Sequence, residues 1–466
     1  MSSSERPAAY HFVGVGGSGM SALAFYHAAC GGRVSGSDRS FDRAFDCGDN
    51  AELRTALAAA GIAILPQDGT GAASGCDEVV VSTAVEQDNP DLRVARERGV
   101  PLLHRSELLA RFVKARRTIA VTGTSGKSTV VAMTFAALRG AGLQPSVITG
   151  GALVELEERG VPGNAWADPR GKLLVVEADE SDGSLVRYEP WCGVVLNLQR
   201  DHKETAEVAA MFRTFRDRVS GPLICGEDAN LDELRPDARF GFAAGAEFRA
   251  EAVELQPDGS RFRVGGTEFA LPTPGRHDVL NALAATAAAA AAGASLPQIA
   301  AALRDFRGVA RRFRTIGTAR GVTVVDDFAH NPDKLRAALA AGRLRGGRIL
   351  AVFQPHGFGP TRFLRDDLVA AFAGALAPCD VLWLPEIFFA GGTVTRDISS
   401  LDIVREVRAA GRDARFAQDR ADLPRLIAAE ARAGDLVLVM GARDPSLTDL
   451  ARDVLAAVTA ASGAEA

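Results

Sequence analysis

The stretch Thr118-Ile-Ala-Val-Thr-Gly-Thr-Ser-Gly-Lys-Ser-Thr129 decides how this chain is interpreted. Its β-branched beginning predicts a strand, and the glycine-rich loop that follows predicts a turn into a helix. Backbone N–H groups around Gly123 and Gly126 can surround phosphate oxygens. Lys127 can neutralise the phosphate charge, and the Ser128 hydroxyl suits Mg2+. The sequence therefore predicts an α/β protein with a phosphate-binding loop at this position.

Carboxylates follow a second apolar strand, which ends at Glu177. The acidic residues after it are Asp179, Glu180 and Asp182, and the next predicted strand, 193–197, leads to His202. Ligands of open α/β sheets gather at the carboxyl ends of strands, so Glu177 and His202 are expected at the same edge as the phosphate loop. This arrangement favours metal positions beside a triphosphate. The alternative is a solvated helix start next to a surface histidine.

The chain is long enough for about three domains, because 466 residues are divided among domains of about 150. Short apolar runs alternate with helix-period stretches, which predicts parallel sheets throughout. A long helical stretch, Val279 to Phe306, and a loop, Arg307 to Thr315, precede the last series of strands. The predicted domains are 1–112, Rossmann-like; 113–310, central and P-loop ATPase-like with a parallel-rich sheet; and 311–466, again Rossmann-like.

Composition excludes several classes of protein. Apolar residues make up 47% and charged residues 24% of the chain, as in globular proteins. The net charge of -5 and the lack of a dense basic stripe argue against nucleic acid as a partner. The alanine-rich stretch 282–294 is too short to span a bilayer, so no membrane partner is expected. The six cysteines are scattered and no signal peptide is recognised, which predicts reduced thiols and a cytoplasmic location.

A second glycine-rich loop, Gly14-Val-Gly-Gly-Ser-Gly19, follows the first predicted strand and opens a helix. Asp38 lies about 20 residues further on, where a ribose-binding acid is expected in a dinucleotide site. The same loop can bind any diphosphate, including the pyrophosphate of a nucleotide sugar. A purely structural tight turn is the third interpretation, and these residues alone leave all three open.

The third predicted domain carries polar clusters after its strands. Arg311 and Arg312 precede the first predicted strand, Asp326-Asp-Phe-Ala-His-Asn-Pro332 follows that strand, and Phe353-Gln-Pro-His356 follows another. Because these clusters stand at carboxyl ends of strands, they predict a ligand site there. Polar groups of all three domains could then converge on one cleft.

In this order, the motifs resemble those of the Mur ligases, ATP-dependent amide-forming enzymes of peptidoglycan precursor synthesis. Within that family the chain is most similar to the MurC type, which joins L-alanine to UDP-N-acetylmuramate. The matching pieces are His11 to Met20, Ser35-Gly-Ser-Asp38, Thr122 to Thr129, Glu177 to Asp182, Asn197 with Asp201-His202, Gly275-Arg-His-Asp278, Arg311-Arg-Phe313 and Asp326 to Pro332. They cover essentially the whole chain.

The resemblance implies both chemistry and ligands. It implies ATP and Mg2+ as cofactors, and as partners a nucleotide sugar like UDP-N-acetylmuramate and an amino acid or short peptide. A carboxylate of the sugar would attack the γ-phosphate, and the amine would convert the resulting acyl phosphate into an amide. The oligomeric state is not predicted.

The resemblance also implies roles for individual residues. The implied catalytic residues are Lys127, Glu177, His202, Arg312 and His330. The implied ATP-binding residues are Gly123, Thr124, Ser125, Gly126, Lys127, Ser128, Thr129, His277, Asp278, Arg312 and Asp327. The implied metal ligands are Ser128, Glu177 and His202, and the implied contacts to the UDP substrate are Gly14, Gly16, Gly17, Ser18, Gly19, Met20, Asp38 and Ser82. Asn331, His356 and Arg362 would bind the amino acid or the substrate carboxylate.

The chain departs from the MurC pattern near the substrate. Gly357 and Pro360 stand where MurC enzymes have arginines, which removes two bidentate guanidinium groups. Asp278 replaces an asparagine and can only accept hydrogen bonds. Arg362, Arg365 or Arg396 could compensate for the lost cations. A related ligase for a different amine or carboxylate is thus an alternative; an NAD-dependent oxidoreductase and a non-catalytic ATP-binding module are others.

Overall fold

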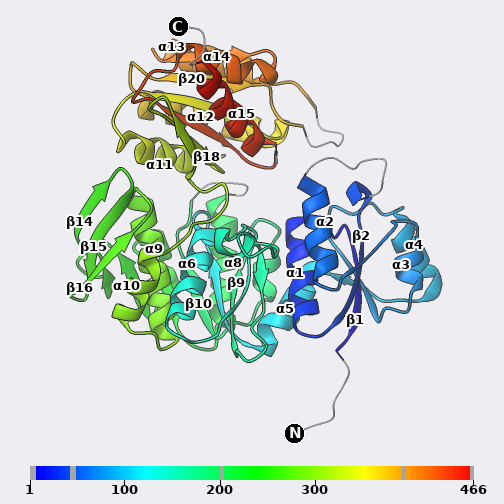
Figure 1. Cartoon of the computed structure of the whole chain (residues 1–466). Helices are drawn as coiled ribbons and strands as arrows, with labels where there is room; N and C mark the ends of the chain where they lie inside the picture. Colours follow the sequence, from blue (N-terminus) through cyan, green and yellow to red (C-terminus); the bar gives the residue numbers. More distant parts are fainter. Residues whose placement is uncertain (1–6, 42–48, 200–203, 390–394, 445, 462–466) are drawn as a thin grey trace. The chain divides into compact units, whose positions relative to one another are not determined.

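The computed structural model describes residues 7–41, 49–199, 204–389, 395–444 and 446–461 (Figure 1). Among these residues the strands form four sheets. The chain divides into two compact units. The first comprises residues 1–251, 263–269 and 280–309, and the second comprises 252–262, 270–279 and 310–466.

The N-terminal sheet has five strands in the order β3-β2-β1-β4-β5. The strands are β1 (Ala9–Val13), β2 (Arg33–Ser37), β3 (Ala63–Leu65), β4 (Glu78–Val81) and β5 (Leu102–His104), and the helices are α1 (Ser18–Ala29), η1 (Arg39–Phe41), α2 (Asp49–Ala59), α3 (Thr70–Ala73), α4 (Pro90–Arg98) and α5 (Arg105–Ala115). Every neighbouring pair is parallel. The strand order reverses at β1, so the glycine-rich loop after β1 lies at the switch point where such sheets bind ligands. The predicted Rossmann-like domain is confirmed.

The central sheet has eight strands in the order β13-β12-β11-β10-β6-β9-β7-β8. Its strands are β6 (Arg117–Thr122), β7 (Ser146–Ile148), β8 (Ala165–Trp166), β9 (Leu173–Glu177), β10 (Cys192–Val195), β11 (Leu223–Gly226), β12 (Ala238–Gly241) and β13 (Phe248–Arg249). Its helices are α6 (Lys127–Gly140), α7 (Val154–Glu157), η2 (Ser184–Arg187), α8 (Thr205–Arg218) and η3 (Ala229–Leu234). Only the edge pair β7–β8 is antiparallel among the described pairs, so the predicted parallel-rich sheet is confirmed.

The stretch after the central sheet differs from the prediction in two ways. A three-stranded sheet of β14 (Glu251–Gln256), β15 (Gly259–Val264) and β16 (Thr267–Leu271) was not predicted. The helical stretch is two helices, α9 (Arg276–Ala291) and α10 (Leu296–Arg304). Gly293, at φ +107°, ends the first, and a capping box of Ser295 with Gln298 begins the second. The prediction overlooked these two local signals within a long alanine run.

The C-terminal sheet has six strands in the order β17-β18-β22-β19-β20-β21. The strands are β17 (Arg314–Ala319), β18 (Val322–Asp327), β19 (Ile349–Gln354), β20 (Val381–Pro385), β21 (Asp413–Ala417) and β22 (Leu436–Gly441), and the helices are α11 (Pro332–Arg343), α12 (Phe358–Ala375), α13 (Ser400–Ala409), η4 (Arg420–Asp422), α14 (Leu423–Glu430) and α15 (Leu447–Ala460). β17 is antiparallel to β18, whereas the other described pairs are parallel. The strands predicted here at 322–325, 348–353, 381–384 and 436–440 are present as β18, β19, β20 and β22.

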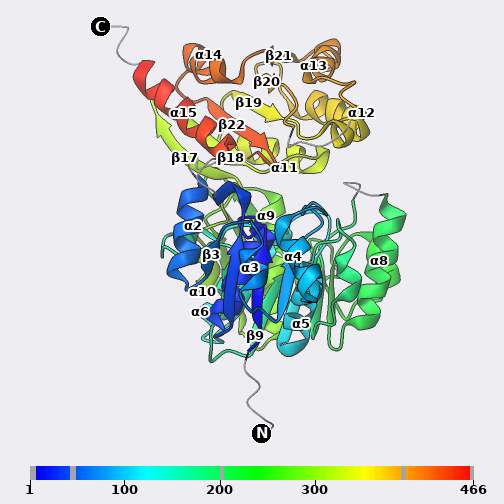
Figure 2. The same ribbon diagram turned by 90° about the vertical axis from the view of Figure 1, so that its right-hand side faces the viewer.

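Alternating residues of the C-terminal strands bury two separate cores, one on each face of the sheet. Val325 belongs to the core that includes residues of α11, α12 and α13, whereas its neighbour Val324 belongs to the core that includes residues of α14 and α15. Figure 2 shows these helices on the two sides of the sheet. The third α/β domain is thus a sandwiched sheet, as predicted.

Three further observations bear on the sequence predictions. Within the described residues no helix is both long and apolar enough to cross a membrane. The described cysteines are free thiols. The predicted domain boundary after residue 112 falls inside α5, and the boundaries stay predictions.

Candidate nucleotide-binding site

The loop between β6 and α6 is held in place by side chains that follow the neighbouring strand β10. Asn197 Oδ1 accepts a hydrogen bond from the Ser125 backbone N–H at 2.9 Å, and Asn197 Nδ2 donates to the Ser125 carbonyl at 3.0 Å. The backbone N–H of Gln199 donates to the Thr124 hydroxyl at 3.0 Å. These bonds are made by the protein's own groups, so the residues after β10 fix the shape of the loop.

Two glycines allow the loop its close turns. Gly126 has φ +92°, and a Cβ there would lie 2.5 Å from Asn281 Oδ1 on α9. Gly123 has φ +132°, and a Cβ there would lie 2.9 Å from Leu196 Cβ. The 14-residue helix α6 begins directly after Gly126 and has no side-chain cap. Its first N–H groups are therefore free of a capping side chain, which is the arrangement that binds anions at helix N-termini.

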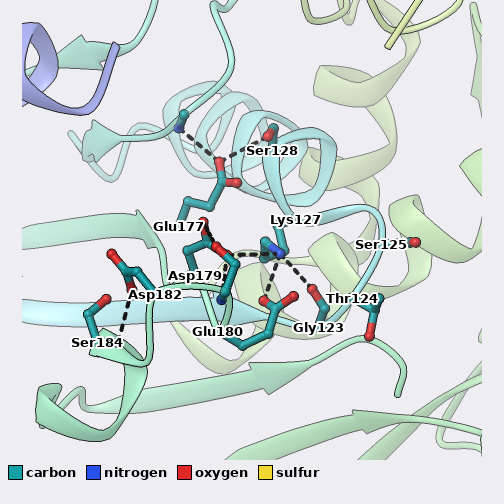
Figure 3. A network of polar contacts seen from close by, with 12 residues as sticks. Gly123, Thr124, Ser125, Lys127, Ser128, Glu177, Asp179, Glu180, Asp182 and Ser184 are labelled. Carbon is teal, nitrogen blue, oxygen red and sulfur yellow. Dashed lines mark hydrogen bonds and ion pairs between the residues drawn. The ribbon is translucent and has the colours of Figure 1, made fainter. Parts of the chain in front are cut away.

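Lys127 is buried among carboxylates at the start of α6 (Figure 3). Its Nζ lies 2.7 Å from Glu180 Oε2, 2.9 Å from the Gly123 carbonyl oxygen and 3.5 Å from Asp179 Oδ1. Burial alone would lower the pKa of Lys127, but Glu180, Asp179 and Glu177 together raise that pKa above its usual value. The side chain therefore stays a cation, as charge neutralisation of phosphates requires.

Glu177 and Ser128 form the second part of the site. Glu177 Oε2 accepts hydrogen bonds from the Ser128 hydroxyl at 2.9 Å, the Thr149 hydroxyl at 2.7 Å and the Gly150 N–H at 2.8 Å. A hydroxyl and a carboxylate in contact are oxygen donors of the kind Mg2+ prefers, with the remaining positions left to water and phosphate. The residues present fit such an ion. His202, the third predicted ligand, lies outside the described residues, and the described part of the chain holds no cluster of three metal-binding side chains.

The N-terminal glycine-rich loop is organised by Asp38 at the end of β2. Asp38 Oδ2 accepts from the Gly16 N–H at 2.8 Å, and Asp38 Oδ1 accepts from the N–H and hydroxyl of Ser40. A Cβ on Gly19 would lie 3.0 Å from an Nη1 atom of Arg105, which pairs with Asp182 at 2.5 Å. Asp38 thus shapes the loop through its backbone, a role that the expectation of a ribose-binding acid did not include.

The remaining predicted contacts to the UDP substrate surround this loop. Gly14, at φ +79°, begins the turn, and Gly17 precedes α1 as its N-cap. Ser18 accepts a hydrogen bond from Asn164 Nδ2 through its carbonyl at 2.7 Å. Met20 is buried in the core of this unit, and Ser82 directly follows β4.

The segment after β18 carries the predicted residues of the C-terminal domain. Asp327 accepts from the N–H groups of Phe313 at 2.7 Å and Ala329 at 2.8 Å, and burial raises the pKa of Asp327 even though Arg312 lowers it. Arg312 lies with its guanidinium carbon 4.9 Å from the centre of the Phe328 ring. Asp327 therefore fixes the backbone next to Arg312 through its hydrogen bond from the Phe313 N–H.

His330 and Asn331 begin the helix that follows. Burial, with help from Lys334, lowers the pKa of His330 well below its usual value. His330 Nδ1 lies 2.9 Å from the Phe328 carbonyl oxygen, and the ring lies 5.4 Å from that of His356. Asn331 Oδ1 accepts from the Lys334 N–H at 3.0 Å and so caps α11. The imidazole is neutral near pH 7 and fits a hydrogen-bonding role.

The possible replacements for the missing arginines are engaged elsewhere in the same unit. Arg362 forms an ion pair with Asp397, Arg365 pairs with Glu406, and the Arg396 guanidinium lies 4.0 Å from the centre of the Phe389 ring. Gly357 has φ +70° and precedes α12 as its N-cap. Each of these arginines would have to leave a neighbour to bind a substrate carboxylate.

The structure brings together the phosphate-loop residues 123–129 and Glu177 in the first unit. His277, Asp278, Arg312, Asp327, His330, Asn331, His356 and Arg362 belong to the second unit. The sequence prediction missed Thr149 and Gly150, which bind Glu177, and also Gln199 and Asn281. A glycine pair after the short strand β7 was the one signal that could have indicated the first two.

Fold and site together define a class: a three-domain α/β protein whose central domain carries a phosphate-binding loop with a lysine and a serine–glutamate pair. Comparison with known families agrees with this class. Residues 9–117 match the Mur ligase family catalytic domain, 121–289 the Mur ligase middle domain, and 311–443 the Mur ligase glutamate ligase domain.

Similar proteins extend along almost the whole chain. The UDP-N-acetylmuramate--L-alanine ligase of Symbiobacterium thermophilum is 39% identical over 93% of this chain and 92% of its own length. The ligase of the same name from Gloeobacter violaceus is 37% identical with the same coverage. The crystal structure of the UDP-N-acetylmuramate-alanine ligase MurC from Thermotoga maritima is 27% identical, with a TM-score of 0.78 over 97% of this chain and 100% of that one. The chain belongs to the Mur ligase family, and the resemblance seen in its motifs is confirmed.

Proposed function

We propose that this protein uses ATP to join the carboxylate of UDP-N-acetylmuramate to L-alanine, and so acts in peptidoglycan precursor synthesis. The observation that carries the proposal is the phosphate loop, with Lys127 and the Ser128–Glu177 pair at the start of the helix that follows it. The names of relatives 37–39% identical over 93% of the chain support the choice of substrates. Because the proposed reaction consumes ATP, we include a cytoplasmic location in the proposal.

The proposed reaction has two steps. A carboxylate oxygen of the sugar attacks the γ-phosphorus of ATP, the bond to the β–γ bridging oxygen breaks, and ADP leaves. The amine nitrogen then attacks the carbonyl carbon of the acyl phosphate, loses a proton, and expels phosphate. Lys127 stabilises the negative charge on the transferring group, because neighbouring carboxylates keep its ammonium charged and its side chain is only 13% exposed.

Ser128, Glu177 and His202 are the residues that would hold Mg2+. When bound there, Mg2+ would neutralise charge on the β- and γ-phosphates and orient them for in-line transfer. The hydrogen bonds from Thr149 and Gly150 fix the Glu177 carboxylate, so that its orientation does not depend on the ion.

The other predicted residues are proposed to bind the substrates. In our proposal the loop of Gly14, Gly16, Gly17, Ser18, Gly19 and Met20, with Asp38 and Ser82, binds the UDP group. His277, Asp278 and Asp327 serve the ATP site and Arg312 reaches its phosphates. His330, Asn331, His356 and Arg362 serve the amine and the carboxylate.

A second candidate function is ligation of a different amine or carboxylate. The observation that favours it is the start of α12, where Gly357 and Pro360 supply no cation. Loss of two guanidinium groups would weaken the binding of a substrate carboxylate.

One experiment tests both candidates. Purified protein is given ATP, Mg2+ and UDP-N-acetylmuramate with a panel of amino acids and short peptides, phosphate release is followed, and the nucleotide-sugar product is weighed by mass spectrometry. Turnover that depends on L-alanine and gives the expected mass gain supports the first function. Turnover with another amine supports the second, and no turnover with any amine contradicts the use of UDP-N-acetylmuramate.

A further inference from the structure

The carboxylates after β9 have different partners, although they stand within six residues. Glu177 is bonded to Ser128, Thr149 and Gly150. Asp182 pairs with Arg105 beside the N-terminal glycine-rich loop. Glu180 is 5% exposed and binds the phosphate-loop lysine directly. The proposed reaction leaves Glu180 without a role.

The ammonium of Lys127 is already occupied by anionic and polar partners of the protein. An ammonium group has three N–H donors. Nζ lies within hydrogen-bond distance of Glu180 Oε2 and the Gly123 carbonyl, and Asp179 Oδ1 lies 3.5 Å away. The side chains of Lys127 and Glu180 are 13% and 6% exposed, so water cannot readily replace either partner. A phosphate oxygen must therefore take the position of a carboxylate oxygen.

We infer that Glu180 is a positioning residue that competes with the nucleotide phosphates for Lys127 and thereby weakens nucleotide binding. Its carboxylate binds the ammonium, which also donates to the Gly123 carbonyl. When phosphates bind, one anionic partner replaces another, so the lysine is never left buried and unpaired. When ADP remains after transfer, the carboxylate can return to Lys127, which favours release of the product.

This inference rests on one part of the proposed function, namely that a nucleotide binds at the phosphate loop. Its test is therefore a binding measurement that does not need the ligase reaction. Isothermal titration calorimetry with ADP, and with a non-hydrolysable ATP analogue, is carried out at fixed excess Mg2+. Glu180→Gln keeps the size of the side chain and removes its charge, and the Kd of ADP is expected to fall by about tenfold, as for removal of a competing charged hydrogen bond.

The matched control is Asp182→Asn, which makes the same change of charge two residues further on. Its carboxylate pairs with Arg105, so the Kd of ADP is expected to stay within about twofold of the parent value. An unchanged or higher Kd for Glu180→Gln overturns the inference. If that variant does not fold, Glu180→Asp tests the same point, because the shorter carboxylate withdraws from Lys127 and the Kd should again fall.

A double-mutant cycle separates an effect through Lys127 from a general one. In a Lys127→Ala background, the Glu180→Gln change should alter the Kd of ADP by less than about twofold. An undiminished effect there would contradict the role of Lys127 as intermediary. Absence of nucleotide binding by the parent protein would instead contradict the proposed function, and the two failures are thus distinguishable.

Discussion

The phosphate loop after β6 and the segment after β18 both follow buried strands of parallel-rich sheets, yet they use their polar side chains differently. In the loop, charged groups bind one another: Lys127 is paired with Glu180, and Ser128 with Glu177. After β18, Asp327 accepts from two backbone N–H groups and Asn331 caps a helix. A ligand atom can replace one partner of a charged side-chain pair, whereas hydrogen bonds to the backbone fix the conformation of the segment. The charged groups of the first region are therefore expected to act mainly on the chemistry, whereas Asp327 and Asn331 also stabilise the segment that carries Arg312 and His330.

The largest expected effect is the loss of activity in Lys127→Ala. The substitution removes the cation that stabilises the transferring phosphate, so kcat should fall by roughly 10²–10³-fold. Phosphate release measures it, and the melting temperature serves as a control. Activity close to that of the parent protein would show that Lys127 does not take part in phosphate transfer. The difference proposed between the two regions would then be wrong.

Asp327→Ala should show the opposite pattern. Two backbone N–H groups lose their acceptor, which should lower the free energy of unfolding by about 2–3 kcal/mol. Thermal melting detects this, and Asp333→Ala, at a half-exposed position beside Arg336, is the matched control that should change little. Equal stability of both variants would remove the distinction drawn for the second region.

Asn197→Ala sharpens the comparison within the loop. It removes both side-chain bonds to Ser125 and leaves the charged groups in place. At about 1 kcal/mol for each bond, the Kd of ADP should rise by roughly tenfold or more. Asn230→Ala, which removes a bond to the neighbouring Leu198 carbonyl, is the control and should leave nucleotide binding unchanged. If both variants bind ADP alike, the loop does not depend on the Asn197 clamp.

The smallest expected effect concerns pH and His330. Burial, aided by Lys334, lowers the pKa of His330 in the folded state, whereas the unfolded chain takes up this proton below about pH 6.5. The unfolded state then binds more protons, so stability should fall as the pH drops below about 6.5. In His330→Gln, the loss of melting temperature between pH 7.5 and 5.5 should be smaller by about 2–4 °C.

His27 and His104 also have lowered pKa values, caused first by burial, so part of the pH dependence should remain in that variant. His27→Gln is the matched control, because His27 is a packed histidine outside the segment after β18. Its pH dependence of the melting temperature shows how much a packed histidine contributes by burial alone. A parent protein whose melting temperature does not change over this range would contradict a neutral His330.

Much of the fold could be predicted from local patterns. The strand, loop and helix around Lys127 are adjacent in sequence, and the strands predicted at 118–122 and 193–197 correspond to β6 and β10. The breaks that were missed, Gly293 and Ser295, are also local, but a continuous alanine run concealed them. The sheet of β14, β15 and β16 was missed because β14 is almost entirely exposed and the apolar pattern of β16 is only five residues long.

The sequence by itself determined the family, the phosphate loop and the strand ends at which polar residues gather, because each is encoded within a few consecutive residues. Only the tertiary structure decided which partner each polar group has. It joined Lys127 to Glu180, Asn197 to Ser125 and Glu177 to Thr149. The physical reason is the strand order β10-β6-β9-β7, which places the ends of strands distant in sequence side by side. The spacing of residues along the chain does not reveal the order of the strands in the sheet.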